Sequence, residues 1–158
     1  MNLNVVQSGK RARQCGECRA CCTTCAVNEL NKSLNTACVH ICERGCAIYE
    51  SRPNSCREYD CAWLQGHLPE KHRPDKSGIV WTFERIEGFD GLLAQAMLLN
   101  EHVPMDRIEF LYGMLRQSSR YPLMLQIIPH TLRARPMKKI AGREVRPGVW
   151  IAVGEAPE

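Results

Sequence analysis

The stretch CGECRACCTTC at residues 15–25 holds five of the ten cysteines of this 158-residue chain. The other five lie between Cys38 and Cys61, and residues 62–158 contain none. Residues 15–66 show little hydrophobic periodicity, so this part of the chain cannot bury enough apolar area to fold by itself. We therefore expect metal ions, bound by cysteine thiolates, to supply its folding energy.

The spacing within residues 15–25 is typical of a site with several metals. Cys15, Cys18 and Cys21 form two overlapping C-x₂-C pairs, and such a pair lets two thiolates reach one metal from a tight turn. Cys22 directly follows Cys21. Because neighbouring residues point their side chains in different directions, this doublet favours two ions, or two irons of one cluster, over an isolated zinc finger.

The cysteine count does not choose the metal. Two zinc sites, two iron–sulfur clusters or one thiolate-bridged zinc cluster all fit within ten cysteines. His40, two residues after Cys38, is a further candidate ligand, although a loop histidine is more often simply exposed. A disulfide framework and a redox-active thiol pair are the alternatives to metal binding.

The overall composition predicts a globular protein of the cytoplasm. The chain is 44% hydrophobic, and no apolar run approaches the roughly 18 residues that a membrane span needs. Its N-terminus lacks the continuous apolar stretch of a signal peptide. In the cytoplasm thiols stay reduced, so clustered cysteines bind metal more often than they form disulfides.

The net charge of +4 is weak support for a nucleic-acid partner, because it counts every cysteine as neutral. Eight thiolates on two Zn²⁺ ions would contribute −8 + 4 = −4 and bring the total to about 0. Four arginines lie inside or beside the cysteine segment, where they can balance such a site: Arg19, Arg44, Arg52 and Arg57.

Three parts of the chain differ in pattern. Residues 1–14 form a polar tail, residues 15–66 form the cysteine region, and residues 67–158 form an α+β region that we expect to be one compact unit with the cysteine region. Residues 67–78 are rich in Pro, Gly and charge and predict a connecting loop.

Apolar residues after residue 78 predict strands and one helix. The alternation at residues 79–83 and the apolar run at residues 92–99 predict a hairpin. Ile108, Leu111 and Leu115 follow Pro104 at helical spacing and predict a helix that ends near residues 118–119. Alternation at residues 123–127 and 149–153 predicts further strands. The expected fold class is α+β, with an irregular cysteine-rich metal-binding region packed on a small, mostly antiparallel sheet and one main helix.

Two motifs resemble those of a known family. CGECRACC at residues 15–22 and CAIYESRPNSCREYDCAW at residues 46–63 are similar to the YkgJ-like CxxCxxCC cysteine-cluster proteins, which are zinc- or iron-chelating domains. The resemblance covers residues 15–64, about a third of the chain. It implies that zinc or iron is held by Cys15, Cys18, Cys21, Cys22, Cys46, Cys56 and Cys61, with Cys38 where an intermediate cysteine is expected. Cys25 and Cys42 are candidate additional ligands.

Other residues of the second motif suggest support for the site. We expect Pro53 to fix a turn, and Arg52 and Arg57 to donate hydrogen bonds to thiolates or to carbonyl groups beside them. Surface ion pairs of little energetic value are the alternative for both arginines. Tyr49 and Trp63 are expected to pack over the metal centre and exclude water.

The sequence contains no recognisable catalytic machinery, so we lean against an enzyme. Its serines lack a nucleophile elbow, its histidines are isolated, and no Walker loop or dinucleotide fingerprint is present. The leading prediction is a metal-binding protein with a structural or metal-handling role. An iron–sulfur redox protein or enzyme is one alternative. A zinc-dependent nucleic-acid-binding protein is another, since residues 133–146 are basic, although a solvated strand or loop is the simpler explanation of that segment.

Overall fold

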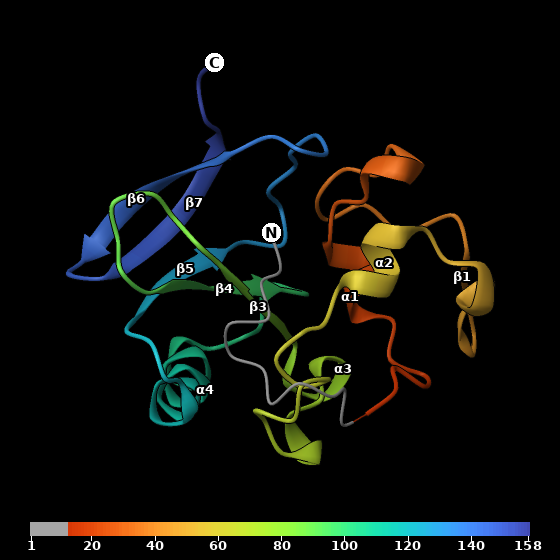
Figure 1. The fold of residues 1–158 in the computed structure, drawn as a ribbon, viewed down its shortest axis with the longest axis horizontal. Coiled ribbons are helices and arrows are strands. Elements are labelled where there is room, and N and C mark those ends of the chain that lie inside the picture. Colours follow the sequence, from red (N-terminus) through yellow and green to blue (C-terminus); the bar gives the residue numbers. More distant parts are fainter. Residues whose placement is uncertain (1–12) are drawn as a thin grey trace.

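The computed structural model describes residues 13–158, so the predicted polar tail at residues 1–14 lies outside the described residues except for its last two. The cysteine region and the α+β region lie side by side, with the cysteine region next to the end of the sheet that carries β3 (Figure 1). Within residues 13–158 no helix is both long and apolar enough to cross a membrane.

The cysteine region consists of short elements joined by turns. Its longest helices have five residues, and its two-stranded sheet pairs Ile41 with Cys46 and Cys42 with Gly45. A single antiparallel bridge joins Val27 to Lys32. The elements are α1 (Ala20–Thr24), η2 (Asn28–Leu30), β1 (Ile41–Cys42), β2 (Gly45–Cys46), η3 (Tyr49–Ser51) and α2 (Asn54–Glu58).

The α+β region has one five-stranded sheet and one main helix, which confirms the predicted fold class. The strand order is β3-β4-β5-β7-β6. The elements are η4 (Glu70–His72), α3 (Pro74–Ser77), β3 (Ile79–Glu84), β4 (Leu92–Leu98), α4 (Met105–Ser118), β5 (Leu123–Ile128), β6 (Ile140–Arg146) and β7 (Val149–Glu155).

The sheet is mixed, because α4 crosses from β4 to a parallel β5 and β7 lies between β5 and β6. The β3–β4 and β6–β7 pairs are antiparallel, and the first of these is the predicted hairpin. The β4–β5 and β5–β7 pairs are parallel. Helix α4 returns the chain to the starting end of the sheet between β4 and β5, and parallel neighbours require such a return.

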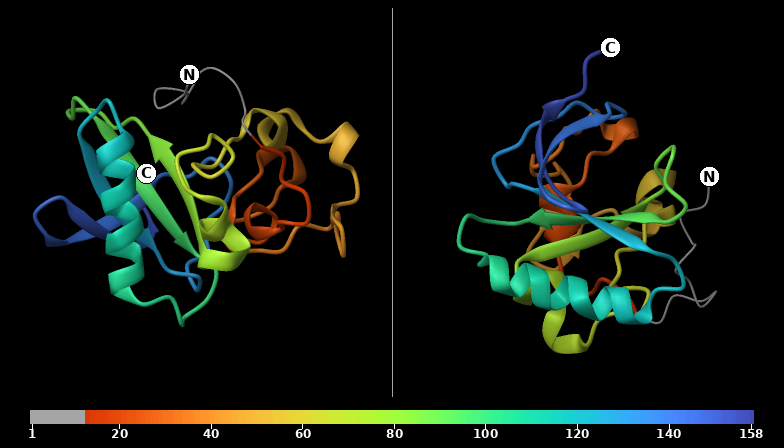
Figure 2. Two further views of the ribbon diagram at one scale, coloured as in Figure 1. Left: turned by 90° about the horizontal axis from the view of Figure 1, so that it is seen from below. Right: turned by 90° about the vertical axis from the view of Figure 1, so that its left-hand side faces the viewer.

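Helix α4 covers one face of the sheet (Figure 2) and has the boundaries that its sequence predicts. Pro104 occupies its N-cap position, and Ile108, Leu111 and Leu115 are its buried residues. The hydroxyl group of Tyr112 donates a hydrogen bond of 2.8 Å to the carbonyl oxygen of Leu123 in β5. The helix is therefore held to the sheet by an apolar stripe and a polar contact.

Two elements differ from the sequence-based expectation. The predicted loop at residues 67–78 contains η4 and α3, and α3 ends at Gly78, whose φ of +81° favours glycine. Strand β6 was not predicted as a separate strand. Most of its residues are exposed, so it lacks the alternation of apolar and polar residues that marks a half-buried strand.

One hydrophobic core extends through both regions. Trp81, Leu111 and Leu125 are at most 1% exposed, and the same cluster includes Ala20 and Trp63 from the cysteine region. Backbone hydrogen bonds also cross between the regions: the N–H of Ala62 donates to the carbonyl of Trp81, and that of Leu34 donates to the carbonyl of Ala134, each at 2.9 Å. The cysteine region is thus attached to β3 and to the segment after β5.

Candidate metal centre

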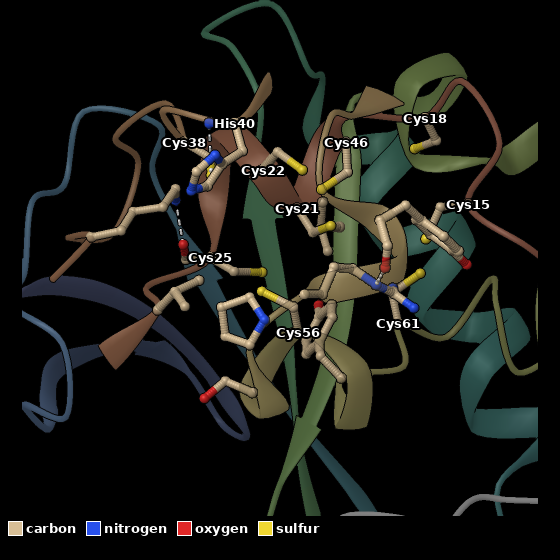
Figure 3. Close-up of a pocket in the computed structure, with 18 of the residues that line it drawn as sticks. Cys15, Cys18, Cys21, Cys22, Cys25, Cys38, His40, Cys46, Cys56 and Cys61 are labelled. Atoms are coloured by element: carbon tan, nitrogen blue, oxygen red, sulfur yellow. Dashed lines mark hydrogen bonds between the residues drawn. The ribbon is translucent and has the colours of Figure 1, made fainter. Parts of the chain in front are cut away.

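Nine cysteines line one cavity in the cysteine region (Figure 3). They include all eight predicted ligands and Cys25. The first and the last of them, Cys15 and Cys61, are far apart in the sequence. The cavity has a volume of about 120 Å³, several times the roughly 10–15 Å³ that one water molecule needs. The cavity is therefore larger than a single ion requires.

The side chains surround the cavity without converging on one point. Within the described residues, no group of three or more His, Cys, Asp or Glu side chains is arranged closely enough to hold a metal ion. The structure therefore brings the predicted ligands to one cavity, while the metal and the ligand set stay predictions.

Cys15, Cys18 and Cys61 lie toward one end of the cavity, and we call them the Cys61 group (Figure 3). When Cys15 and Cys18 carry a negative charge, they act electrostatically on the thiol of Cys61. A tight turn places the first two, since the N–H of Cys18 donates to the carbonyl of Cys15 at 3.0 Å and Gly16 has a φ of +55°. The expected C-x₂-C turn is present here.

Backbone amides donate to two sulfurs of the Cys61 group. The N–H groups of Ala20 and Asp75 donate to Cys18, and those of residues 63–64 donate to Cys61. These bonds favour the thiolate form, but burial outweighs them. Burial raises the pKa of Cys18, and it raises the pKa of Cys61 to about 12.

A second set of thiols, which we call the Cys56 group, consists of Cys22, Cys38, Cys46 and Cys56. The first three act electrostatically on Cys56, whose pKa is raised first of all by burial. The backbone N–H of His40 lies 3.4 Å from the sulfur of Cys38 and donates to it. Helix α1, strand β2, helix α2 and the loop before β1 each contribute one of these four thiols.

Cys21 lies between the two groups, and its thiol interacts with that of Cys22, its neighbour in α1. The two thiols are hydrogen-bonded, and this contact, with burial, raises the pKa of Cys21 well above its ordinary value. The same hydrogen bond is the main cause that lowers the pKa of Cys22 to about 7. Both residues belong to α1, where adjacent positions share one broad face, so both thiols face the cavity.

Cationic side chains stand beside the Cys56 group. Lys32 is only 5% exposed and its ammonium group donates to the carbonyl of Cys25. The guanidinium of Arg52 lies 3.8 Å from the centroid of the Tyr49 ring. After the Cys21 hydrogen bond, Lys32 and Arg52 further lower the pKa of Cys22. No motif in the sequence marks Lys32, and our sequence reasoning missed it.

Arg52 and Arg57 both donate to carbonyl groups near the cavity, one of the two kinds of contact that we predicted for them. The Nε atom of Arg52 donates to the carbonyl of Tyr49 at 2.8 Å, and that of Arg57 donates to the carbonyl of Arg52 at 2.9 Å. These bonds hold the turn at Pro53, which joins η3 to α2. This turn places Cys56, in α2, at the cavity.

Aromatic residues form part of the cavity wall. Tyr49 and Trp63 line it, as predicted, and the guanidinium of Arg13 lies 4.8 Å from the centroid of the Trp63 ring. The buried indole N–H of Trp63 has no hydrogen-bond acceptor within residues 13–158. Sequence reasoning missed Tyr59, which lines the cavity, interacts with the Cys25 thiol, and has a pKa raised well above its ordinary value by burial.

The three doubtful ligands separate into two kinds. Cys25 and His40 line the cavity. Cys42 belongs to β1 and is not among the residues that line it; the guanidinium of Arg19 donates to the Cys42 carbonyl at 3.3 Å. All ten cysteines are free thiols, so the structure gives no support to a disulfide framework.

The basic segment at residues 133–146 is partly neutralised by carboxylates of the same chain. This reduces the positive charge that could attract a polyanion, and it weakens the prediction of a nucleic-acid partner. The ion pairs are Arg135–Glu155, Lys138–Glu158 and Arg146–Glu109.

Comparison with protein-family models, curated proteins and solved structures gives no match to this chain. The resemblance to YkgJ-like proteins therefore rests on the two sequence motifs at residues 15–22 and 46–63.

Proposed function

We propose that this protein binds zinc or iron, in a site with several metals, through the thiolates that line its cavity. One observation carries the proposal: the eight cysteines that the family resemblance implies as ligands all line the same cavity. We place the protein in the cytoplasm, where reducing conditions keep such thiols available to metal.

The chemistry of the cavity wall suits this occupant. Thiolates are soft ligands that select zinc, copper(I) or iron–sulfur clusters. A bound metal ion would neutralise part of their negative charge. Backbone N–H groups already point at Cys18, Cys38 and Cys61. The buried indole N–H of Trp63 needs an acceptor, and a metal-bound thiolate or sulfide is such an acceptor.

The two cysteine groups suggest two centres. The Cys56 group offers four thiols, the number that a closed tetrahedral zinc site uses. The Cys61 group offers three, and Cys21, which lies within electrostatic reach of Cys15, completes it. Coordination would join segments that have little regular secondary structure, so the first role of the metal would be to fold the cysteine region.

Anaerobic purification followed by elemental analysis and a visible spectrum tests the proposal. Zinc would give a colourless protein with stoichiometric metal, and an iron–sulfur cluster would give a brown protein bleached by dithionite. Cys56→Ser should lower the metal content, while Cys42→Ser, outside the cavity, should not. Absence of stoichiometric zinc and iron, with thiol reactivity unaffected by a chelator, would reject metal binding.

An iron–sulfur redox protein is the second candidate, and the cavity volume favours it. About 120 Å³ is more space than one ion needs, and N–H donors to cysteine sulfur are among the features that set the potential of such clusters. Colour, and its loss on reduction, separate this candidate from a zinc protein in the same experiment.

A further inference from the structure

Lys32 is a buried cation in the wall of the cysteine cavity. It lines the cavity and is 5% exposed, and its ammonium group donates to the carbonyl of Cys25. The thiols that act on it electrostatically are those of Cys25, Cys38, Cys22 and Cys21. The second and third of these belong to the Cys56 group.

A buried ammonium group needs an anion, and the carboxylates of the described chain do not provide one. The ion pairs formed by residues 13–158 do not include Lys32. An unpaired charge away from water is strongly unfavourable. The groups around Lys32 that can become anionic are cysteine thiols.

A loaded Cys56 group would supply this anion. Four thiolates on one divalent ion carry a net charge of about −2, and Lys32 with Arg52, which also lines the cavity, contributes two positive charges. The charges then balance within the cavity wall. The hydrogen bond from Lys32 to the carbonyl of Cys25 could be made by any donor, so this bond alone does not explain why a cation lies here.

We propose that Lys32 is the internal counter-charge of the metal centre formed by the Cys56 group, and that its charge sets how tightly this centre holds a divalent ion. The inference rests on the proposed metal-binding function. It does not extend to the Cys61 group, where backbone amides face the sulfurs and the nearby cation, Arg73, is already paired with the carboxylate of Asp75.

The backbone of Lys32 forms its hydrogen bonds independently of the side chain, so a substitution leaves these bonds in place. The N–H of Lys32 donates to the carbonyl of Val27 at 3.0 Å, and the reverse bond measures 2.9 Å. Lys32→Met removes charge and donor, Lys32→Gln removes the charge but keeps a donor, and Lys32→Arg keeps both. Lys71→Met removes one charge from an exposed residue and is the matched control.

The test is competition between each protein and a chromophoric chelator for Zn²⁺, with Co²⁺ absorption reporting thiolate ligation. Loss of an outer-shell partner of a metal ligand typically costs about 10- to 100-fold in affinity. We expect a loss of this size at one centre in Lys32→Met and Lys32→Gln. Lys32→Arg and Lys71→Met should bind like the wild type, with the Co²⁺ spectrum unchanged in all four.

The outcomes separate this inference from the function on which it rests. If the wild type binds Zn²⁺ and Lys32→Gln binds it equally well, the protein is a metal binder and Lys32 is only a hydrogen-bond donor. If Lys71→Met weakens binding as much as Lys32→Met, the effect is one of net charge and the inference is also overturned. A wild type that binds neither Zn²⁺ nor iron removes the proposed function itself.

Discussion

The cysteine region and the α+β region are held together by different forces. In the α+β region an apolar stripe of α4 packs on a five-stranded sheet, and residues such as Trp81, Leu111 and Leu125 are almost fully buried. In the cysteine region no helix exceeds five residues, and turns orient thiols toward a cavity. Burial of apolar area accounts for the first region, whereas the proposed metal would supply part of the folding energy of the second.

Removal of metal should therefore produce the largest difference in stability between the two regions. A chelator should abolish amide protection from hydrogen exchange across residues 15–61, because coordination and folding are coupled there. Strands β4 and β5 should keep most of their protection. Hydrogen exchange read by mass spectrometry measures both regions in one sample.

Re-addition of Zn²⁺ is the control for that experiment, since it should restore protection in residues 15–61. Equal protection with and without chelator would show that the cysteine region folds by its own contacts. Equal loss in both regions would show that the sheet depends on the metal as well.

Acidification should release metal in two steps, which sharpens the difference between the two cysteine groups. Burial raises the pKa of Cys61 to about 12, so this thiol retains its proton to high pH and protons displace metal from it readily as the pH falls. Besides the hydrogen bond from Cys21, which a metal bound at Cys21 would remove, Lys32 and Arg52 lower the pKa of Cys22 and so favour its thiolate against that competition. We expect the Cys61 group to release Zn²⁺ at the higher pH.

A chromophoric indicator of free Zn²⁺ follows this release across a pH titration. Cys61→Ser should remove the step at higher pH, and Cys56→Ser should remove the step at lower pH. A single step in the wild type, lost entirely in either variant, would indicate one shared cluster in place of two centres.

Leu111→Ala should destabilise the α+β region by about 2–5 kcal/mol, the range for removal of a buried leucine side chain. Leu111 is fully buried on the face of α4 that meets the sheet. The shared core carries the effect to both regions, so urea unfolding should shift in the loaded protein. Met105→Ala, on an exposed residue of the same helix, is the control and should change stability little.

The sequence predicted the two regions unequally. Helix α4 and strands β3, β4, β5 and β7 were predictable, because their apolar residues follow a regular period. Strand β6 was not, because exposed residues carry no such pattern. In the cysteine region the family resemblance implied eight ligands, and all eight line one cavity together with Cys25. The sequence could not predict Lys32 or Tyr59, whose place in the wall depends on turns rather than on a period.

The smallest effect that we expect is that of Tyr112→Phe, and it should stay within the α+β region. The Tyr112 hydroxyl donates to the carbonyl of Leu123 at 2.8 Å, and loss of one such bond costs about 0.5–1.5 kcal/mol. Because the ring remains, the contact of α4 with the sheet is kept. The urea midpoint of the loaded protein should fall slightly, while Zn²⁺ affinity should not change. A fall in affinity would mean that the packing of α4 is coupled to the cavity, and the two regions would then have to be treated as one cooperative unit.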